Sequence, residues 1–87
     1  MVTLEKAFGE VLQEIRQERG LSQEQLGFES GYHRTYISLL ERGKKNPSLN
    51  AIFRLANALK INPADILRRV EVRVAEIPHR ERREHDL

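Results

Sequence analysis

The fold of this chain is decided by residues 22–45, which read SQEQLGFESGYHRTYISLLERGKK. Ser22 is a favourable helix N-cap, and Gln25, three residues later, completes a capping box. The helix that begins there must end before Gly31, which occupies a turn position that often requires a positive φ. A second short helix is predicted over residues 33–42. The stretch therefore predicts two short helices joined by a tight turn.

The second helix combines an apolar face with a basic end. Ile37 and Leu40 are three residues apart and predict one buried face. Gly43 ends this helix, and residues 44–47, KKNP, form a basic connection that is incompatible with a helix. Two helices of this length with a three-residue turn match the spacing of a DNA-binding helix-turn-helix.

The sequence of this region also resembles that of a known family. SQEQL at 22–26, Gly31, Ile37, and LERGKKNPS at 40–48 are together similar to the Xre-type, lambda-repressor-like helix-turn-helix family of bacterial and phage transcription regulators. The resemblance covers residues 6–68 and implies an all-α, five-helix DNA-binding domain. Gly27 departs from the family, which usually has alanine there. We expect this glycine to loosen the first motif helix slightly without changing its packing.

Composition and charge limit the possible classes of protein. The 87 residues suffice for one small helical domain, and the absence of cysteine excludes disulfides and thiolate metal sites. No apolar run reaches the roughly 18 residues of a membrane span, and the N-terminus does not resemble a signal peptide, so we expect a cytoplasmic protein. The net charge is only +2. The charges nevertheless segregate, with glutamates on residues 3–19 and basic residues around the second motif helix, as in many specific DNA-binding proteins.

Helices that enter the major groove contact bases mainly through their first two turns. Arg34 is the best candidate for base recognition, because its planar guanidinium group can donate hydrogen bonds to guanine O6 and N7 at the same time. Thr35 and His33 are further base-contact candidates, although His33 can alternatively serve only as a cap. Hydroxyl, amide and basic side chains are expected to contact the DNA backbone: Tyr36, Ser38, Arg42, Lys44, Lys45 and Asn46. The family resemblance adds Gln23 at a phosphate, beside the helix N-terminus.

The family resemblance also implies a structural ion pair. In the family an arginine at the position of Arg16 pairs with a glutamate 25 residues later, which is Glu41 here. Such a pair would fix the angle between the first helix and the second motif helix rather than add much stability. The alternative is two independent surface charges.

Three further helices are predicted around the motif. Residues 3–19 have an apolar stripe at the helical period, formed by Leu4, Ala7, Phe8, Val11, Leu12 and Ile15. Residues 48–59 begin at the N-cap Ser48 and have a stripe expected to be buried: Leu49, Ile52, Leu55, Ala56 and Leu59. Asn62 is expected to cap the last helix, in which Ile66 and Leu67 anchor the packing. Residues 1–69 would form the DNA-binding domain.

Beyond Arg69 the pattern changes. Valines alternate with charged residues, which predicts a β-strand within a dimerisation segment, residues 70–78. A lone strand needs a partner ladder, so we expect it to pair with a second molecule through Val70, Val72, Val74 and Ile77, with Glu71 and Arg73 paired across the ribbon. The alternative extends the last helix. Residues 79–87 are expected to form a disordered charged tail.

The sequence contains no motif that would support catalysis. We expect a homodimeric, sequence-specific regulator that binds a palindromic site on double-stranded DNA, without cofactor, metal, small-molecule ligand or membrane partner. Residues 33–38, HRTYIS, are similar to the controllers of restriction–modification systems. The alternative is an antitoxin or another interaction module that binds a partner polypeptide through its C-terminal segment.

Overall fold

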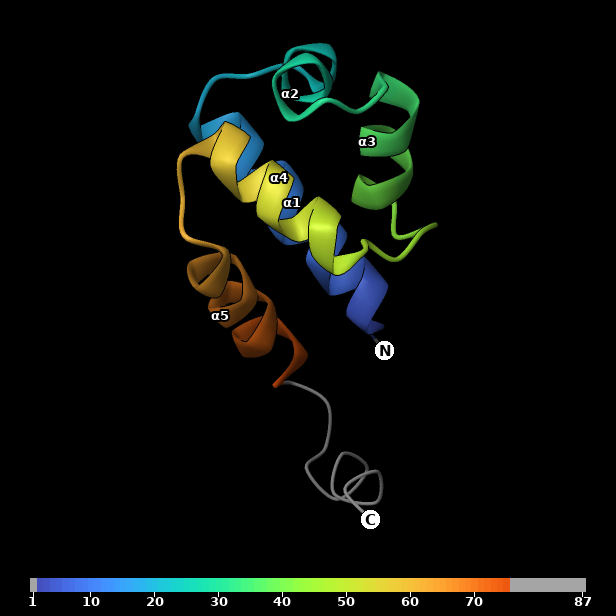
Figure 1. Ribbon diagram of the computed structural model, residues 1–87. Helices are drawn as coiled ribbons and strands as arrows, with labels where there is room; N and C mark the ends of the chain where they lie inside the picture. The colour runs from blue at the N-terminus through green and yellow to red at the C-terminus, as the bar shows by residue number, and fades with distance from the viewer. Residues whose placement is uncertain (1, 76–87) are drawn as a thin grey trace.

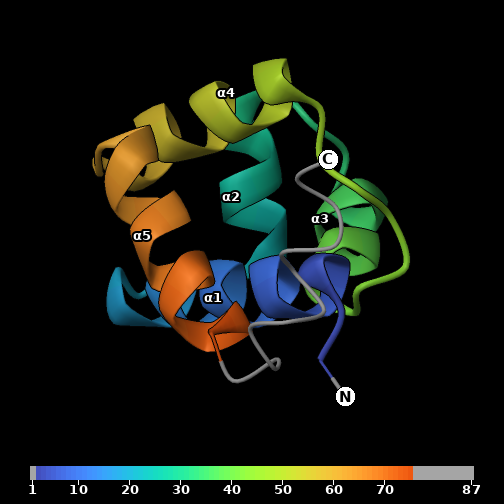
Figure 2. The same ribbon diagram turned by 90° about the horizontal axis from the view of Figure 1, so that it is seen from below.

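The chain folds into five helices, as the computed structural model of residues 2–75 shows (Figure 1). Their bounds are α1 Leu4–Glu18, α2 Gln23–Ser30, α3 Arg34–Glu41, α4 Leu49–Leu59 and α5 Pro63–Val74. The predicted all-α, five-helix class is confirmed. Helices α3 and α5 lie on opposite sides of the molecule in both views (Figures 1 and 2), with α1 between them.

The helices begin where the local sequence predicts. The Ser22 hydroxyl accepts a hydrogen bond from Gln25 N at 3.0 Å, and Gln25 Oε1 accepts one from Ser22 N at 2.8 Å, which completes the capping box. Ser48 caps α4 through Ala51 N at 3.0 Å. Asn62 was expected to cap α5. It occupies the N-cap position, but its side chain makes no capping hydrogen bond, and Pro63 is the first residue of the helix.

All five helices contribute to one hydrophobic core. Its largest fully buried side chains are Val11, Leu12, Ile15, Leu26, Ile37, Leu40, Leu55, Leu59 and Ile66. The two short motif helices place only three of these residues in the core. They therefore depend on α1, α4 and α5 for burial of their apolar faces.

Three residues assigned to buried positions are exposed instead. Leu4 is 61% exposed, Leu49 70% and Leu67 45%. Each lies at the margin of its helix's apolar stripe. Phe53, which lies off the stripe of α4, is 56% exposed. Together with the half-buried Ile52 these residues form the "apolar face", which spans α1, α4 and α5.

The predicted C-terminal strand is wrong. Residues 70–74 continue α5, and residues 2–75 contain no strand. Val70 is buried and Val74 packs against the core, four residues apart on one helical face, whereas Val72 points to solvent. Val70 is buried and Val74 half-buried against the core of the monomer, so neither is available for the predicted intermolecular strand. Ile77 and the tail expected at 79–87 lie outside the described residues.

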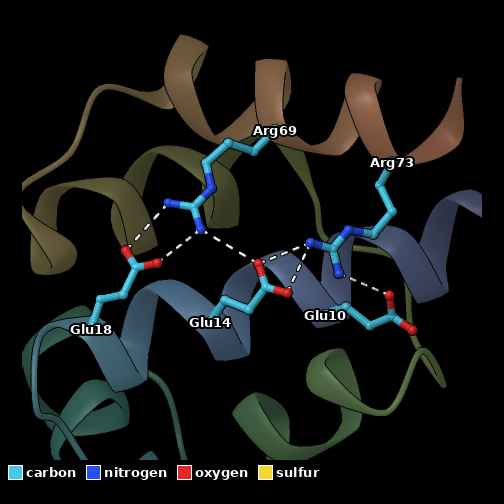
Figure 3. A network of polar contacts seen from close by, with 5 residues as sticks. All are labelled: Glu10, Glu14, Glu18, Arg69 and Arg73. Carbon is cyan, nitrogen blue, oxygen red and sulfur yellow. Dashed lines mark hydrogen bonds and ion pairs between the residues drawn. The ribbon is translucent and has the colours of Figure 1, made fainter.

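An ion-pair network explains why this segment stays helical. Arg69 and Arg73 project from α5 toward three glutamates of α1 (Figure 3). Arg73 binds Glu10 at 3.0 Å and Glu14 at 2.8 Å, and Arg69 binds Glu18 at 3.1 Å. Arg73 is therefore committed to α1 rather than to Glu71 of a second chain, as the strand prediction required. Four-residue spacing on both helices keeps the opposite charges in register.

The network shifts the titration of its members. The hydrogen bond from Arg69 lowers the pKa of the Glu18 carboxyl, and the same contact raises the pKa of Arg69. Hydrogen bonds to Glu10 and Glu14 likewise raise the pKa of Arg73. These side chains are between 29% and 51% exposed to water, so each pair contributes little to stability alone. Among the described helices, none is both long and apolar enough to cross a membrane.

Candidate nucleic-acid interface

The predicted tight turn between α2 and α3 is present and brings the two helices close together. Gly31 has φ +81°, and Tyr32 N donates to Gly27 O at 2.8 Å. A Cβ on Gly27 would lie 2.6 Å from Tyr32 O and 3.2 Å from Arg34 N, both backbone atoms. The expectation that Gly27 loosens α2 slightly without changing its packing is therefore wrong, because the close approach requires the absence of a Cβ. The glycine allows α2 to approach the start of α3 closely.

Arg54 of α4 holds this turn from the other side. Its Nε donates to Ser30 O at 3.1 Å and its Nη2 to Gly31 O at 3.3 Å, which satisfies carbonyls at the end of α2. The guanidinium carbon also lies 4.5 Å from the centre of the Tyr32 ring, a cation–π contact. Sequence reasoning missed Arg54, because nothing local distinguishes it from a solvated arginine on α4.

Gly9 sets the distance between α1 and α3. It is buried, and a Cβ there would collide with Leu40 O and lie 2.7 Å from Glu41 O. Only glycine permits this approach of the α3 backbone to α1. The signal in the sequence was a glycine inside an otherwise regular helix, which often marks a packing requirement.

A buried polar cluster joins α1, α2 and α3. Arg16 Nε donates to Glu41 Oε2 at 2.6 Å and Arg16 Nη2 to Glu41 Oε1 at 3.0 Å, so the expected ion pair is present and bidentate. Gln23 Nε2 also donates to Glu41 Oε1 at 3.0 Å. One carboxylate of α3 thus binds side chains of α1 and α2. Gln23 was expected to point its amide at a phosphate, but this nitrogen already has a partner on α3.

The side of α3 opposite to Ile37 and Leu40 is open to solvent. Arg34 and Thr35 are exposed and Ser38 is half-buried, so the first turn presents a guanidinium and a hydroxyl outward. His33 is also exposed, and its Nδ1 accepts a hydrogen bond from Thr35 N at 3.0 Å. The capping role left open for His33 is therefore present, and only its Nε2 remains for another contact.

Tyr36 occupies a more protected position than its neighbours. Its ring centre lies 4.7 Å from that of Tyr32, and the residue is half-buried. Burial raises the pKa of the Tyr36 phenol, a nearby Tyr32 hydroxyl adds to the rise, and the Ser48 backbone opposes it. The hydroxyl is therefore protonated at neutral pH and able to donate a hydrogen bond to a phosphate.

The basic residues predicted to contact the DNA backbone follow α3. Arg42, Lys44, Lys45 and Asn46 are all exposed. Gly43, at φ +72°, ends the helix, and Lys44 N donates to Leu39 O at 2.9 Å. This turn places Lys44 and Lys45 directly beyond the C-terminal end of α3. No three histidine, aspartate or glutamate side chains within residues 2–75 gather into a metal site.

Comparison with known proteins agrees with this geometry. A family model described as helix-turn-helix matches residues 12–66. The chain belongs to the Xre-type helix-turn-helix family of transcription regulators. Members of this family are DNA-binding regulators rather than enzymes, and the same holds for this chain.

The relatives of this chain include proteins named as control or controller proteins. The control protein C.BamHI from Bacillus amyloliquefaciens is 46% identical over 61 residues, which are 69% of this chain and 75% of that protein. The crystal structure of the restriction–modification controller C.AhdI from Aeromonas hydrophila is 47% identical, with a TM-score of 0.70 over 71% of this chain and 94% of the other.

The fold extends to regulators with other roles. The clp gene regulator ClgR from Corynebacterium glutamicum is 28% identical and superposes with a TM-score of 0.81, covering 98% of this chain and 90% of that one. The overall arrangement of helices in this chain is thus similar to that in both solved structures.

Proposed function

We propose that this protein is a sequence-specific regulator that binds a palindromic operator as a homodimer, with α3 in the major groove. The main support for the proposal is that α3 is packed against the domain on one side and exposed on the other. Its inner face is held by Ile37, Leu40 and the Glu41 cluster, whereas Arg34 and Thr35 are free at its first turn. A helix fixed on one side and polar on the other is suited to groove recognition.

The candidate contacts divide into two kinds. Arg34 and Thr35 would read base edges, with His33 Nε2 as a third contact. The hydroxyls of Tyr36 and Ser38, together with Arg42, Lys44, Lys45 and Asn46, would contact phosphate and sugar. Gln23 would join this second group through the second hydrogen of its amide and the N-terminus of α2. Specificity would come from the first set, and affinity with its salt dependence from the second.

The apolar face supports dimerisation. Leu4, Ile52 and Leu67 line a groove of about 350 Å³ between α1, α4 and α5, and Leu49 and Phe53 continue the exposed side of α4 beside it. Monomers seldom expose apolar residues gathered in this way. A second copy related by a two-fold axis would cover the face with the same residues, because such an interface is self-complementary. The revised dimer surface therefore replaces the strand.

The names of the most similar relatives support a controller role. On this proposal the protein regulates genes of a restriction–modification system, acts in the cytoplasm on nucleoid DNA, and responds to its own concentration. A gene for an endonuclease or a methyltransferase beside its own gene would be expected. Partner proteins and small-molecule effectors have no part in the proposal.

The test is footprinting on the DNA upstream of the protein's own gene. We expect two protected major-groove patches on one side of the duplex, with centres about 34 Å apart, as two α3 helices of a dimer would give. Arg34→Ala should need about 5- to 160-fold more protein than the wild type to give the same protection. Uniform protection of all sequences tested would contradict the proposal.

A further inference from the structure

Phe28 is the most exposed large hydrophobic side chain among residues 2–75, at 87%. It lies on α2, whereas the apolar face belongs to α1, α4 and α5, so the proposed dimer leaves the ring uncovered. Nothing in the packing of the described residues requires a phenylalanine at this place. An exposed aromatic ring outside a known interface suggests a contact of its own.

The surroundings of Phe28 indicate what that contact is. A surface hollow of about 370 Å³ lies between α2 and the start of α3, and its lining consists of Glu24, Phe28, Tyr32, His33, Arg34 and Thr35. Phe28 therefore borders the same concavity as Arg34 and Thr35, the two residues proposed to read bases. Figure 1 shows how α2 and the beginning of α3 face each other across the turn.

We infer that Phe28 determines specificity by packing on the C5-methyl group of a thymine at the edge of each half-site. This inference rests on the proposed function, because it requires α3 to be in the major groove. Thymine is the base that presents a methyl group there, and phenylalanine is one of the side chains that contact it. The Glu24 carboxylate in the same hollow would repel a phosphate, which favours a base edge over the backbone as the occupant.

The experiment uses the operator identified by selection and replaces each thymine in turn with deoxyuridine, which removes only the methyl group. At one thymine per half-site we expect wild-type binding to weaken about fourfold, the loss of one buried methyl group. Phe28→Ala should bind the natural operator about fourfold more weakly and should lose nothing further at that deoxyuridine. This non-additivity is the signature of a direct contact.

Val72→Ala is the control, because it shortens another exposed apolar side chain, which lies on α5 and outside both the hollow and the apolar face. It should respond to deoxyuridine as the wild type does. Unfolding of Phe28→Ala should match the wild type, since the ring is exposed. The inference would be overturned if deoxyuridine weakened binding equally in wild type and Phe28→Ala at every position. It would also be overturned if Phe28→Ala bound the operator as tightly as the wild type. The exposed ring would then be a contact for another protein instead of for DNA. Failure to select any operator would instead contradict the proposed function.

Discussion

Glu41 receives two hydrogen bonds from the Arg16 guanidinium, at 2.6 and 3.0 Å, across 25 residues of sequence. The same carboxylate accepts from Gln23 at 3.0 Å. Arg16 Nη1 also donates to Leu21 O at 2.8 Å, which fixes the connection between α1 and α2. One buried carboxylate at the C-terminal end of α3 therefore joins this helix to both α1 and α2, and we expect it to help fix the angle of α3.

Removing this carboxylate should destabilise the domain strongly. Glu41→Ala leaves the buried Arg16 charge unpaired, so we expect the free energy of unfolding to fall by about 3–5 kcal/mol. Urea denaturation followed by circular dichroism measures the change. The double variant Arg16→Met with Glu41→Leu should lose less than Glu41→Ala alone. Arg42→Ala, at the exposed next residue, is the control. A loss for Glu41→Ala no larger than for the control would contradict this role.

The substitution Gly9→Ala tests whether the close packing of α1 against α3 outweighs helix propensity in its effect on stability. Alanine normally stabilises a helix interior relative to glycine by about 1 kcal/mol. At Gly9 we expect the opposite, because the new methyl group would collide with Leu40 O and force α1 and α3 apart. Thermal unfolding should show a lower midpoint, and DNA binding should weaken even at temperatures where the variant is folded. Gln13→Ala, on the exposed side of α1, should change neither. A more stable Gly9→Ala variant would refute the close packing.

Base and backbone contacts should respond differently to mutation. Arg34→Ala should lose about 1–3 kcal/mol on the preferred site and relax the preference at one base position. Lys44→Ala should weaken binding to preferred and scrambled DNA alike and reduce the slope of log K against log salt by about 1. Fluorescence anisotropy at several salt concentrations measures both. An equal loss for Arg34→Ala on scrambled DNA would show that it reads no base.

The network between α1 and α5 should weaken in acid. The folded-state pKa of Glu18 is lowered, so its pairing with Arg69 stabilises the fold above the unfolded-state pKa and is lost as the pH falls through the folded-state value. Arg69→Ala should therefore lower the midpoint of thermal unfolding at pH 7, and the difference from wild type should shrink toward pH 3. Lys45→Ala, in the exposed loop, should cost little at either pH. A difference that persists unchanged at pH 3 would rule out this linkage.

Dimerisation through the apolar face predicts opposite results for the two exposed phenylalanines. Phe53→Asp places a charge in the proposed interface and should convert the dimer into a folded monomer, as sedimentation velocity would show. Phe28→Asp introduces the same charge on α2, outside this face, and the protein should remain a dimer. If both variants remained dimeric, the interface would have to lie elsewhere.

The motif helices could be predicted because their signals are local. The capping box of Ser22 and Gln25, the left-handed turn at Gly31 and the cap at Ser48 each depend on residues within one turn of the helix. The Arg16–Glu41 pair is not local, and only its family spacing of 25 residues made it predictable.

The C-terminal end of α5 could not be decided from periodicity alone. Val70 and Val74 fit both a strand with alternating valines and a helical face. The deciding interactions are tertiary, since Arg69 and Arg73 match the glutamates of α1. The contacts of Arg54 were missed for the same reason, because its partners lie more than 20 residues away.

Sequence-specific binding by a dimer is tested most directly by selection of bound DNA from a random pool at physiological salt, followed by sequencing. We expect a two-fold symmetric consensus whose half-sites lie about 34 Å apart, and loss of preference at one position in each half when the selection is repeated with Arg34→Ala. Absence of any enriched sequence, from protein that is folded and dimeric, would contradict it.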